Sequence, residues 1–90
     1  MNEKMKRENI RMFEIKYLGA TNTLGTRIRI SDLRFKKSVI IDTDNIFLID
    51  AEQYLNKIGI KIDFFGEGIE TDFLMSRNFE TALIKVSGWV

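Results

Sequence analysis

The sequence predicts an α+β domain in which an antiparallel sheet of four to five strands has one helix packed on one face. Two observations predict this fold class. Several short segments alternate apolar and polar side chains, and one central segment has the period of an amphipathic helix. The length of 90 residues, with 44% hydrophobic and 30% charged residues, fits one small globular domain. We expect residues 1–11, which are polar and densely charged, to form a tail before a single domain over residues 12–90.

The first two strands are expected to form a β-hairpin. Residues 13–17 alternate apolar and charged side chains, and residues 26–31 alternate again with Ile28 and Ile30 on one face. Residues 19–25 between them are rich in Gly, Thr and Asn, which favour turns. The two strands are therefore predicted to pair through a fairly long tip. This tip lacks the lysine and the following helix of a phosphate-binding P-loop, which excludes nucleotide binding of that kind.

A helix over residues 51–58 is the most clearly predicted element. Its apolar side chains recur at i, i+3, i+4 and i+7. Asp50 is expected to be the N-cap, with Gln53 at the capping-box position, and Gly59 is a natural stop. The preceding apolar residues 46–49 fit either a short strand or a plug of the core.

Alternation and turn formers predict further strands on both sides of this helix. A third strand is expected over residues 37–41, and a fourth over residues 60–64 with its three apolar side chains pointing inward. A turn at residues 66–68 then leads into a partner strand over residues 69–76.

The C-terminal segment allows two interpretations. Residues 79–86 fit a second helix, with Asn78 as its cap, or another strand. Trp89 follows close to the C-terminus and is expected to dock onto its own domain, with an interface hot spot as the alternative.

The composition argues against catalysis and against a bound metal or cofactor. The chain contains no Cys and no His, which excludes disulfides, thiolate nucleophiles, Cys/His zinc sites and Ser-His-Asp triads. No carboxylate pair has a spacing that selects acid–base catalysis, and residues 42–45 do not continue into a calcium-binding loop. We therefore expect a non-enzymatic protein with no cofactor and no metal. The longest apolar run, residues 46–49, is too short to cross a membrane, so a cytoplasmic protein without a membrane partner is expected.

Positive and negative charge are unevenly distributed along the chain, although the formal net charge is only +1. Residues 1–37 contain ten Lys or Arg against four acidic residues, and residues 38–90 contain four against nine. This asymmetry indicates either an anionic partner or two halves that neutralise each other on folding.

The candidate partner-binding segment follows the hairpin tip and consists of Arg27, Arg29, Arg34, Phe35, Lys36 and Lys37. On a strand, Arg27 and Arg29 point the same way, about 6.6 Å apart at a rise of about 3.3 Å per residue. Guanidinium groups bind phosphates and carboxylates in bidentate fashion, and Phe35 offers a stacking surface for a base. The alternative is a solvated face of a hairpin whose charges protect an exposed edge.

A candidate acidic face surrounds the turn at residues 66–68 and consists of Asp63, Glu67, Glu70 and Asp72. Nothing in the spacing of these carboxylates selects a glycosidase-like pair. They are interpreted as a solvated hairpin, or as an acidic face presented to a basic partner.

Part of the hairpin resembles a known family. Residues 17–29, YLGATNTLGTRIR, resemble the opening motif KYLGPTNxxGSRIKA of a family of small uncharacterised phage and mobile-element proteins, with Ala20 in place of Pro and Thr26 in place of Ser. Weaker likenesses follow in the family's next strand, helix end, glycine-rich turn and last strand, at residues 38–42, 55–59, 66–68 and 72–74. The resemblance implies a phage-type origin and a β-β-(β)-α-β-β order, and it implies no activity.

These observations lead to one main functional hypothesis and two alternatives. The main hypothesis is a non-enzymatic phage-type binding protein that blocks a host protein or ribonucleoprotein complex through charged surfaces, for example an anti-CRISPR-like inhibitor of a defence nuclease in the host cytoplasm. The first alternative is a nucleic-acid-binding protein that uses the basic hairpin over residues 27–37 and the cations of the tail, among them Arg11. The second is a structural homo-oligomeric subunit, for example a homodimer formed through a strand edge.

Overall fold

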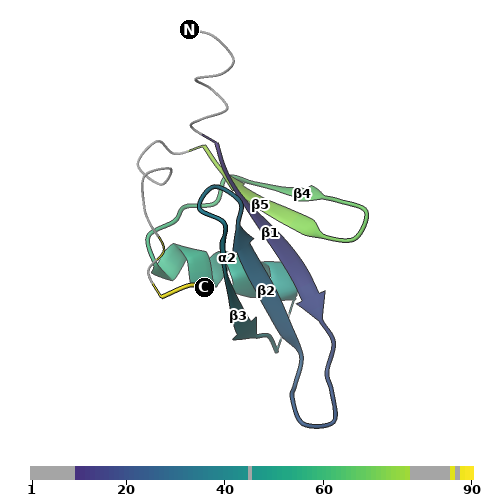
Figure 1. Cartoon of the computed structure of the whole chain (residues 1–90). Helices are drawn as coiled ribbons and strands as arrows, with labels where there is room; N and C mark the ends of the chain where they lie inside the picture. The colour runs from purple at the N-terminus through teal and green to yellow at the C-terminus, as the bar shows by residue number, and fades with distance from the viewer. Residues whose placement is uncertain (1–9, 45, 78–85, 87) are drawn as a thin grey trace, which may run out of the picture.

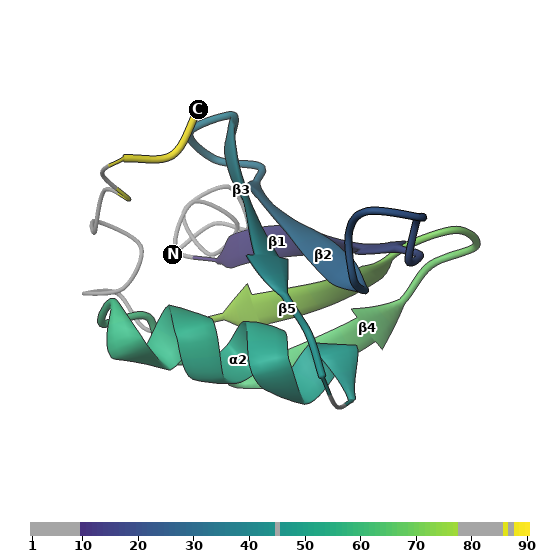
Figure 2. The same cartoon turned by 90° about the horizontal axis from the view of Figure 1, so that it is seen from below.

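The computed structural model describes residues 10–44, 46–77, 86 and 88–90, and it confirms the predicted α+β fold (Figure 1). A five-stranded antiparallel sheet has the strand order β3-β2-β1-β5-β4. One helix, α2, lies along one face of this sheet, as Figure 2 shows from below. The elements are β1 (Arg11–Leu18), β2 (Arg27–Asp32), β3 (Lys37–Asp42), α2 (Phe47–Lys57), β4 (Phe64–Glu67) and β5 (Asp72–Ser76). The predicted helix or strand over residues 79–86 falls almost wholly outside the described residues.

The first three strands form the predicted antiparallel meander. Ile15 lies opposite Ile30 between β1 and β2, and Ile28 lies opposite Ile41 between β2 and β3. Directly opposed residues share a face of the sheet, so these isoleucines all point toward α2. Ile15, Ile28 and Ile30 are buried there against Leu55 of the helix, which places the hydrophobic core between α2 and the centre of the sheet.

The helix begins earlier than predicted. It starts at Phe47, with Ile46 at the N-cap and no side-chain cap hydrogen bond, so the assignment of Asp50 as N-cap and the short strand at residues 46–49 were wrong. The alternative, in which this segment plugs the core, holds for Phe47 and Leu48. Asp50 lies in the first turn, where its carboxylate accepts a hydrogen bond from the hydroxyl of Thr43. Phe47 and Leu48 pack against the core and extend the apolar stripe of the helix by one turn.

The helix ends as predicted, because Gly59 adopts the left-handed conformation at φ 96°. The amide of Gly59 donates to the carbonyl of Asn56, and the amide of Ile60 donates to that of Leu55. These two bonds form a Schellman motif, which a positive φ at the glycine makes possible. Because the amide of Ile60 is bonded within this motif, it does not pair with a neighbouring strand, and no strand begins at Ile60.

The fourth strand therefore lies later in the chain than predicted. Ile60 is buried as expected, but β4 starts at Phe64, whose side chain is 44% exposed on the face opposite α2. The strand continues through Glu67, so the turn spans residues 68–71, where the amide of Gly68 donates to the carbonyl of Thr71 at 2.7 Å. The prediction of an inward Phe64 was wrong because the strand register begins only after the helix-terminal motif.

Trp89 docks onto its own domain, as predicted. Its ring lies 6.2 Å from that of Phe13 and 6.2 Å from that of Tyr54, and the side chain is only 6% exposed. The next residue, Val90, exchanges two backbone hydrogen bonds with Ser38 of β3. No helix in the described part of the chain has the length and apolar character needed to cross a membrane.

Candidate partner-binding surfaces

The face of the sheet opposite α2 carries a group of cations that we call the cationic patch: Lys16, Arg27 and Arg29. Lys16 of β1 lies directly opposite Arg29 of β2, and Arg27 lies two residues before Arg29 on the same face. Ile28 and Ile30, which alternate with these arginines, are fully buried on the α2 side. No described element covers the cationic patch, and both Lys16 and Arg29 are exposed.

The charges of the cationic patch are not balanced by ion pairs within the described part of the chain. Arg27 lies directly opposite Asp42 of β3, and Glu14 precedes Lys16 by two residues on the same face, yet neither carboxylate forms a salt bridge with the patch. Like charges placed opposite each other destabilise a sheet. The open face of the sheet therefore carries unpaired cations beside two carboxylates, which is a mixed charge pattern.

The rest of the predicted basic segment lies elsewhere. Arg34, Phe35 and Lys36 form the turn between β2 and β3, and Lys37 begins β3. The six residues of β2 separate this turn from Arg27 by roughly 20 Å, given a rise of about 3.3 Å per residue. The six predicted residues thus form two groups at opposite ends of β2, and only Arg27 and Arg29 share a face with Lys16.

One face of the Phe35 ring is covered by the chain itself. The guanidinium carbon of Arg11 lies 5.0 Å from the centre of this ring. Asp32 stabilises the turn that contains Phe35, since Oδ1 of Asp32 accepts hydrogen bonds from the amides of Arg34 at 3.0 Å and Phe35 at 3.4 Å. Arg11 itself is fully buried, so it is not available to nucleic acid as a cation of the tail.

The four predicted acidic residues lie at the two ends of the β4–β5 hairpin. Glu67 and Asp72 are directly opposite each other, and Glu70 lies in the turn that follows. Asp63 lies at the other end of β4, where its Oδ2 accepts a hydrogen bond from the amide of Arg77 at 2.8 Å. Among the described residues, no group of three or more acidic side chains is arranged to hold a metal ion.

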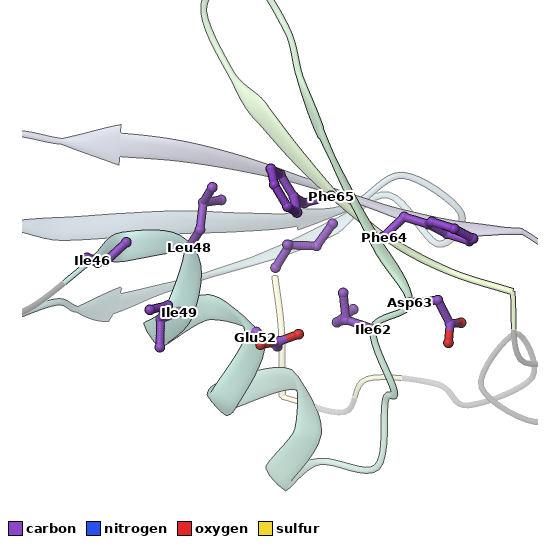
Figure 3. Close-up of a pocket in the computed structure, with 9 residues that line it drawn as sticks. Ile46, Leu48, Ile49, Glu52, Ile62, Asp63, Phe64 and Phe65 are labelled. Carbon is purple, nitrogen blue, oxygen red and sulfur yellow. The ribbon is translucent and has the colours of Figure 1, made fainter.

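Sequence reasoning missed an apolar groove, which we call the β4 groove. It lies between the first turns of α2 and β4 and has a volume of about 400 Å³ (Figure 3). Its lining consists of Ile46, Leu48, Ile49, Glu52, Ile62, Asp63, Phe64, Phe65 and Leu74. The groove could not be found in the sequence because both the start of α2 and the start of β4 differ from their predicted positions.

Comparisons with models of protein families, with curated proteins and with solved structures find no match. The likeness of residues 17–29 to the phage family motif therefore stays a prediction. The surfaces described above carry the functional argument.

Proposed function

We propose that this domain is a non-enzymatic binding protein that blocks another protein by docking the cationic patch onto a carboxylate-bearing surface. The observation that carries the proposal is the position of Lys16, Arg27 and Arg29 on the open face of the sheet, without ion pairs in the described part of the chain. Guanidinium groups bind carboxylates in bidentate fashion, and unpaired charges at a rim increase the rate of association.

Two features favour a protein over a nucleic acid as the partner. The patch is bordered by the carboxylates of Glu14 and Asp42, a mixed pattern that an equally mixed protein surface complements better than a uniformly anionic backbone. The rings of Phe35 and Phe64 each have a guanidinium group of the chain itself over one face, from Arg11 and Arg77. A base could therefore stack on only one face of each of these rings.

The resemblance of residues 17–29 to phage proteins adds an expectation about the partner. In a phage, a small domain with an unpaired cationic face would act on a bacterial host, by occupying a protein or ribonucleoprotein complex such as a defence nuclease. The proposed mode of action is steric occupation of that surface rather than chemistry.

Affinity capture from a bacterial host lysate, with and without nuclease treatment, tests the proposal. The wild-type protein is compared with the variant R27Q/R29Q and with the control K37Q/K57Q, which removes the same charge from exposed positions outside the patch. We expect a protein partner that survives nuclease treatment, with binding reduced at least about tenfold by R27Q/R29Q and unchanged by the control.

Two results would contradict the proposal. A partner lost on nuclease treatment, together with oligonucleotide binding that weakens steeply with salt and with R27Q/R29Q, would identify a nucleic-acid-binding protein instead. Equal losses in both double variants would show that net charge, and not the cationic patch, drives binding.

A further inference from the structure

β4 is an edge strand whose two phenylalanines lie outside the core. β5 pairs with one edge of β4, and no described strand pairs with the other. Phe64 and Phe65 are 44% and 66% exposed, and neither belongs to the buried cluster. An unpaired edge with exposed apolar side chains is a template for the addition of another strand.

The β4 groove lies where such an added strand would point its side chains. Phe65 and Leu74 are directly opposite each other on β4 and β5, so both side chains face the α2 side of the sheet. Ile46 and Ile49 at the start of α2 form the other wall, while Phe64 points away from Phe65, as Figure 3 shows. Because side chains alternate along a strand, every second residue of an added strand would face this apolar groove.

The ionisable side chains that line the groove are acidic, although the neighbouring parts of the chain also carry cations. Glu52 and Asp63 are the two ionisable residues that line it, and both are acidic. Glu67 lies at the end of β4, opposite Asp72. Of the neighbouring cations, Arg77 lies over the ring of Phe64, which points to the opposite face of the sheet. A positively charged partner segment is therefore electrostatically complementary to this groove.

We propose that the β4 edge and the β4 groove bind an extended basic segment of another protein. The segment adds to the sheet as a sixth strand. Its side chains that face the α2 side place apolar groups in the groove at the centre and Lys or Arg at the two ends, beside Glu52, Asp63 and Glu67. A second copy of this chain is disfavoured, since an isologous contact would bring the same carboxylates together. This site lies on the α2 side of the sheet and is independent of the cationic patch.

Fluorescence anisotropy with three kinds of labelled seven-residue peptide tests the proposal. The first, the Lys-Ile peptide, has the sequence Lys-Thr-Ile-Thr-Ile-Thr-Lys, so that its Lys and Ile side chains share one face of an extended strand. The second has Glu in place of both Lys residues, and the third is the Lys-Ile peptide N-methylated either at its odd-numbered or at its even-numbered residues. We expect the first peptide to bind at least about tenfold more tightly than the second. We also expect at least one of the two methylated forms to lose binding, because methylation removes the amide donors of one strand edge.

Matched variants locate the binding site. Phe65→Ala is expected to weaken the Lys-Ile peptide by about tenfold or more, whereas Ile69→Ala, which removes an exposed side chain outside the groove lining, is expected to have no effect. Glu52→Lys is expected to weaken the basic peptide and to strengthen the acidic one. R27Q/R29Q is expected to leave peptide binding unchanged, so a failure at this site is distinguishable from a failure at the cationic patch.

Several outcomes would overturn the proposal. They are equal binding of the acidic and basic peptides, no effect of methylation at either set of amides, no effect of Phe65→Ala, or no binding of any peptide up to about 1 mM. Concentration-dependent dimerisation in ultracentrifugation that Phe65→Ala abolishes would make a second copy the occupant, which also contradicts the proposal.

Discussion

Arg11 and Asp32 form a fully buried ion pair that connects the start of β1 to the end of β2. Nη2 of Arg11 donates to Oδ2 of Asp32 at 2.6 Å, and neither side chain is exposed to solvent. The guanidinium carbon of Arg11 lies 5.2 Å from the ring centre of Phe13 and 5.0 Å from that of Phe35. Because the other oxygen of Asp32 accepts two amides of the following turn, this carboxylate holds the strand pair and the turn together.

Asp32→Asn is therefore expected to destabilise the domain strongly. The amide oxygen of asparagine can still accept from the turn, but the buried guanidinium of Arg11 loses the negative charge of Asp32, at a cost of about 3–5 kcal/mol. Asp32→Ala is expected to cost roughly 1–2 kcal/mol more, because the turn amides of Arg34 and Phe35 lose their acceptor as well. Urea unfolding followed by circular dichroism measures both values.

The stability of the double variant R11M/D32N shows how much of the loss in Asp32→Asn is caused by the buried charge of Arg11. It removes both charges and keeps the turn acceptor, so it is expected to recover most of the stability that Asp32→Asn alone loses. A double variant that is less stable than Asp32→Asn would show that the contacts of Arg11, rather than its charge, dominate.

The ion pair also shows the limit of what the sequence predicts. Local alternation predicted the first three strands correctly, and Gly59 predicted the end of the helix, since both signals lie within a few neighbouring residues. Arg11 and Asp32 lie 21 residues apart, and their pairing depends on how β1 and β2 align. The sequence therefore predicted that Arg11 belongs to a polar tail, although β1 begins at this residue.

The same reasoning applies to the candidate sites. Alternation along β2 was enough to predict that Arg27 and Arg29 share a face, but the contribution of Lys16 depends on the register between β1 and β2. The spread of Arg34, Lys36 and Lys37 to the far end of β2 follows from the extended backbone, which separates residues that are close in sequence. The β4 groove depends on where α2 and β4 start, and both starts differ from their predicted positions.

Trp89→Ala is expected to cost about 3–5 kcal/mol, because Trp89 is buried between Phe13 and Tyr54 and its removal leaves a large cavity. Val90→Ala is the matched control. The Val90 side chain is exposed, and its backbone bonds to Ser38 do not depend on the side chain, so its stability is expected to stay within about 0.5 kcal/mol of the wild type. Thermal unfolding measures both. Equal effects would contradict the docking of Trp89.

Gly68→Ala is expected to cost about 1–3 kcal/mol through crowding in the β4–β5 turn. A Cβ atom at this position would lie 2.6 Å from the carbonyl oxygen of Thr71 and 2.9 Å from the ring of Phe73. Gly25→Ala in the β1–β2 tip is the control, since nothing lies within 4 Å of a Cβ there. Urea unfolding of the two variants distinguishes this local clash from a general effect of removing glycine, which would change both alike.

Ile46→Ser is expected to stabilise the protein while weakening peptide binding at the β4 groove. Ile46 is the N-cap of α2 and has extended backbone angles, but it offers no side-chain acceptor to the free amides of the first turn. A serine hydroxyl can accept one of them, a gain of about 0.5–2 kcal/mol. The loss of burial is small because Ile46 is 63% exposed.

The same substitution removes an apolar side chain from the lining of the β4 groove, so the Lys-Ile peptide is expected to bind several-fold more weakly. The unfolding midpoint is expected to rise by about 4–8 °C for each kcal/mol of stability gained. Ile49→Ser is the matched comparison within the helix. It lies past the N-cap, where serine has no capping role, and it is expected to lose both stability and binding. Thermal unfolding and peptide anisotropy on the same samples separate the two effects. If peptide affinity followed the stability of the helix, Ile46→Ser would strengthen binding and Ile49→Ser would weaken it. Weaker binding by both variants shows that the lining of the groove, and not the stability of the helix, determines the affinity.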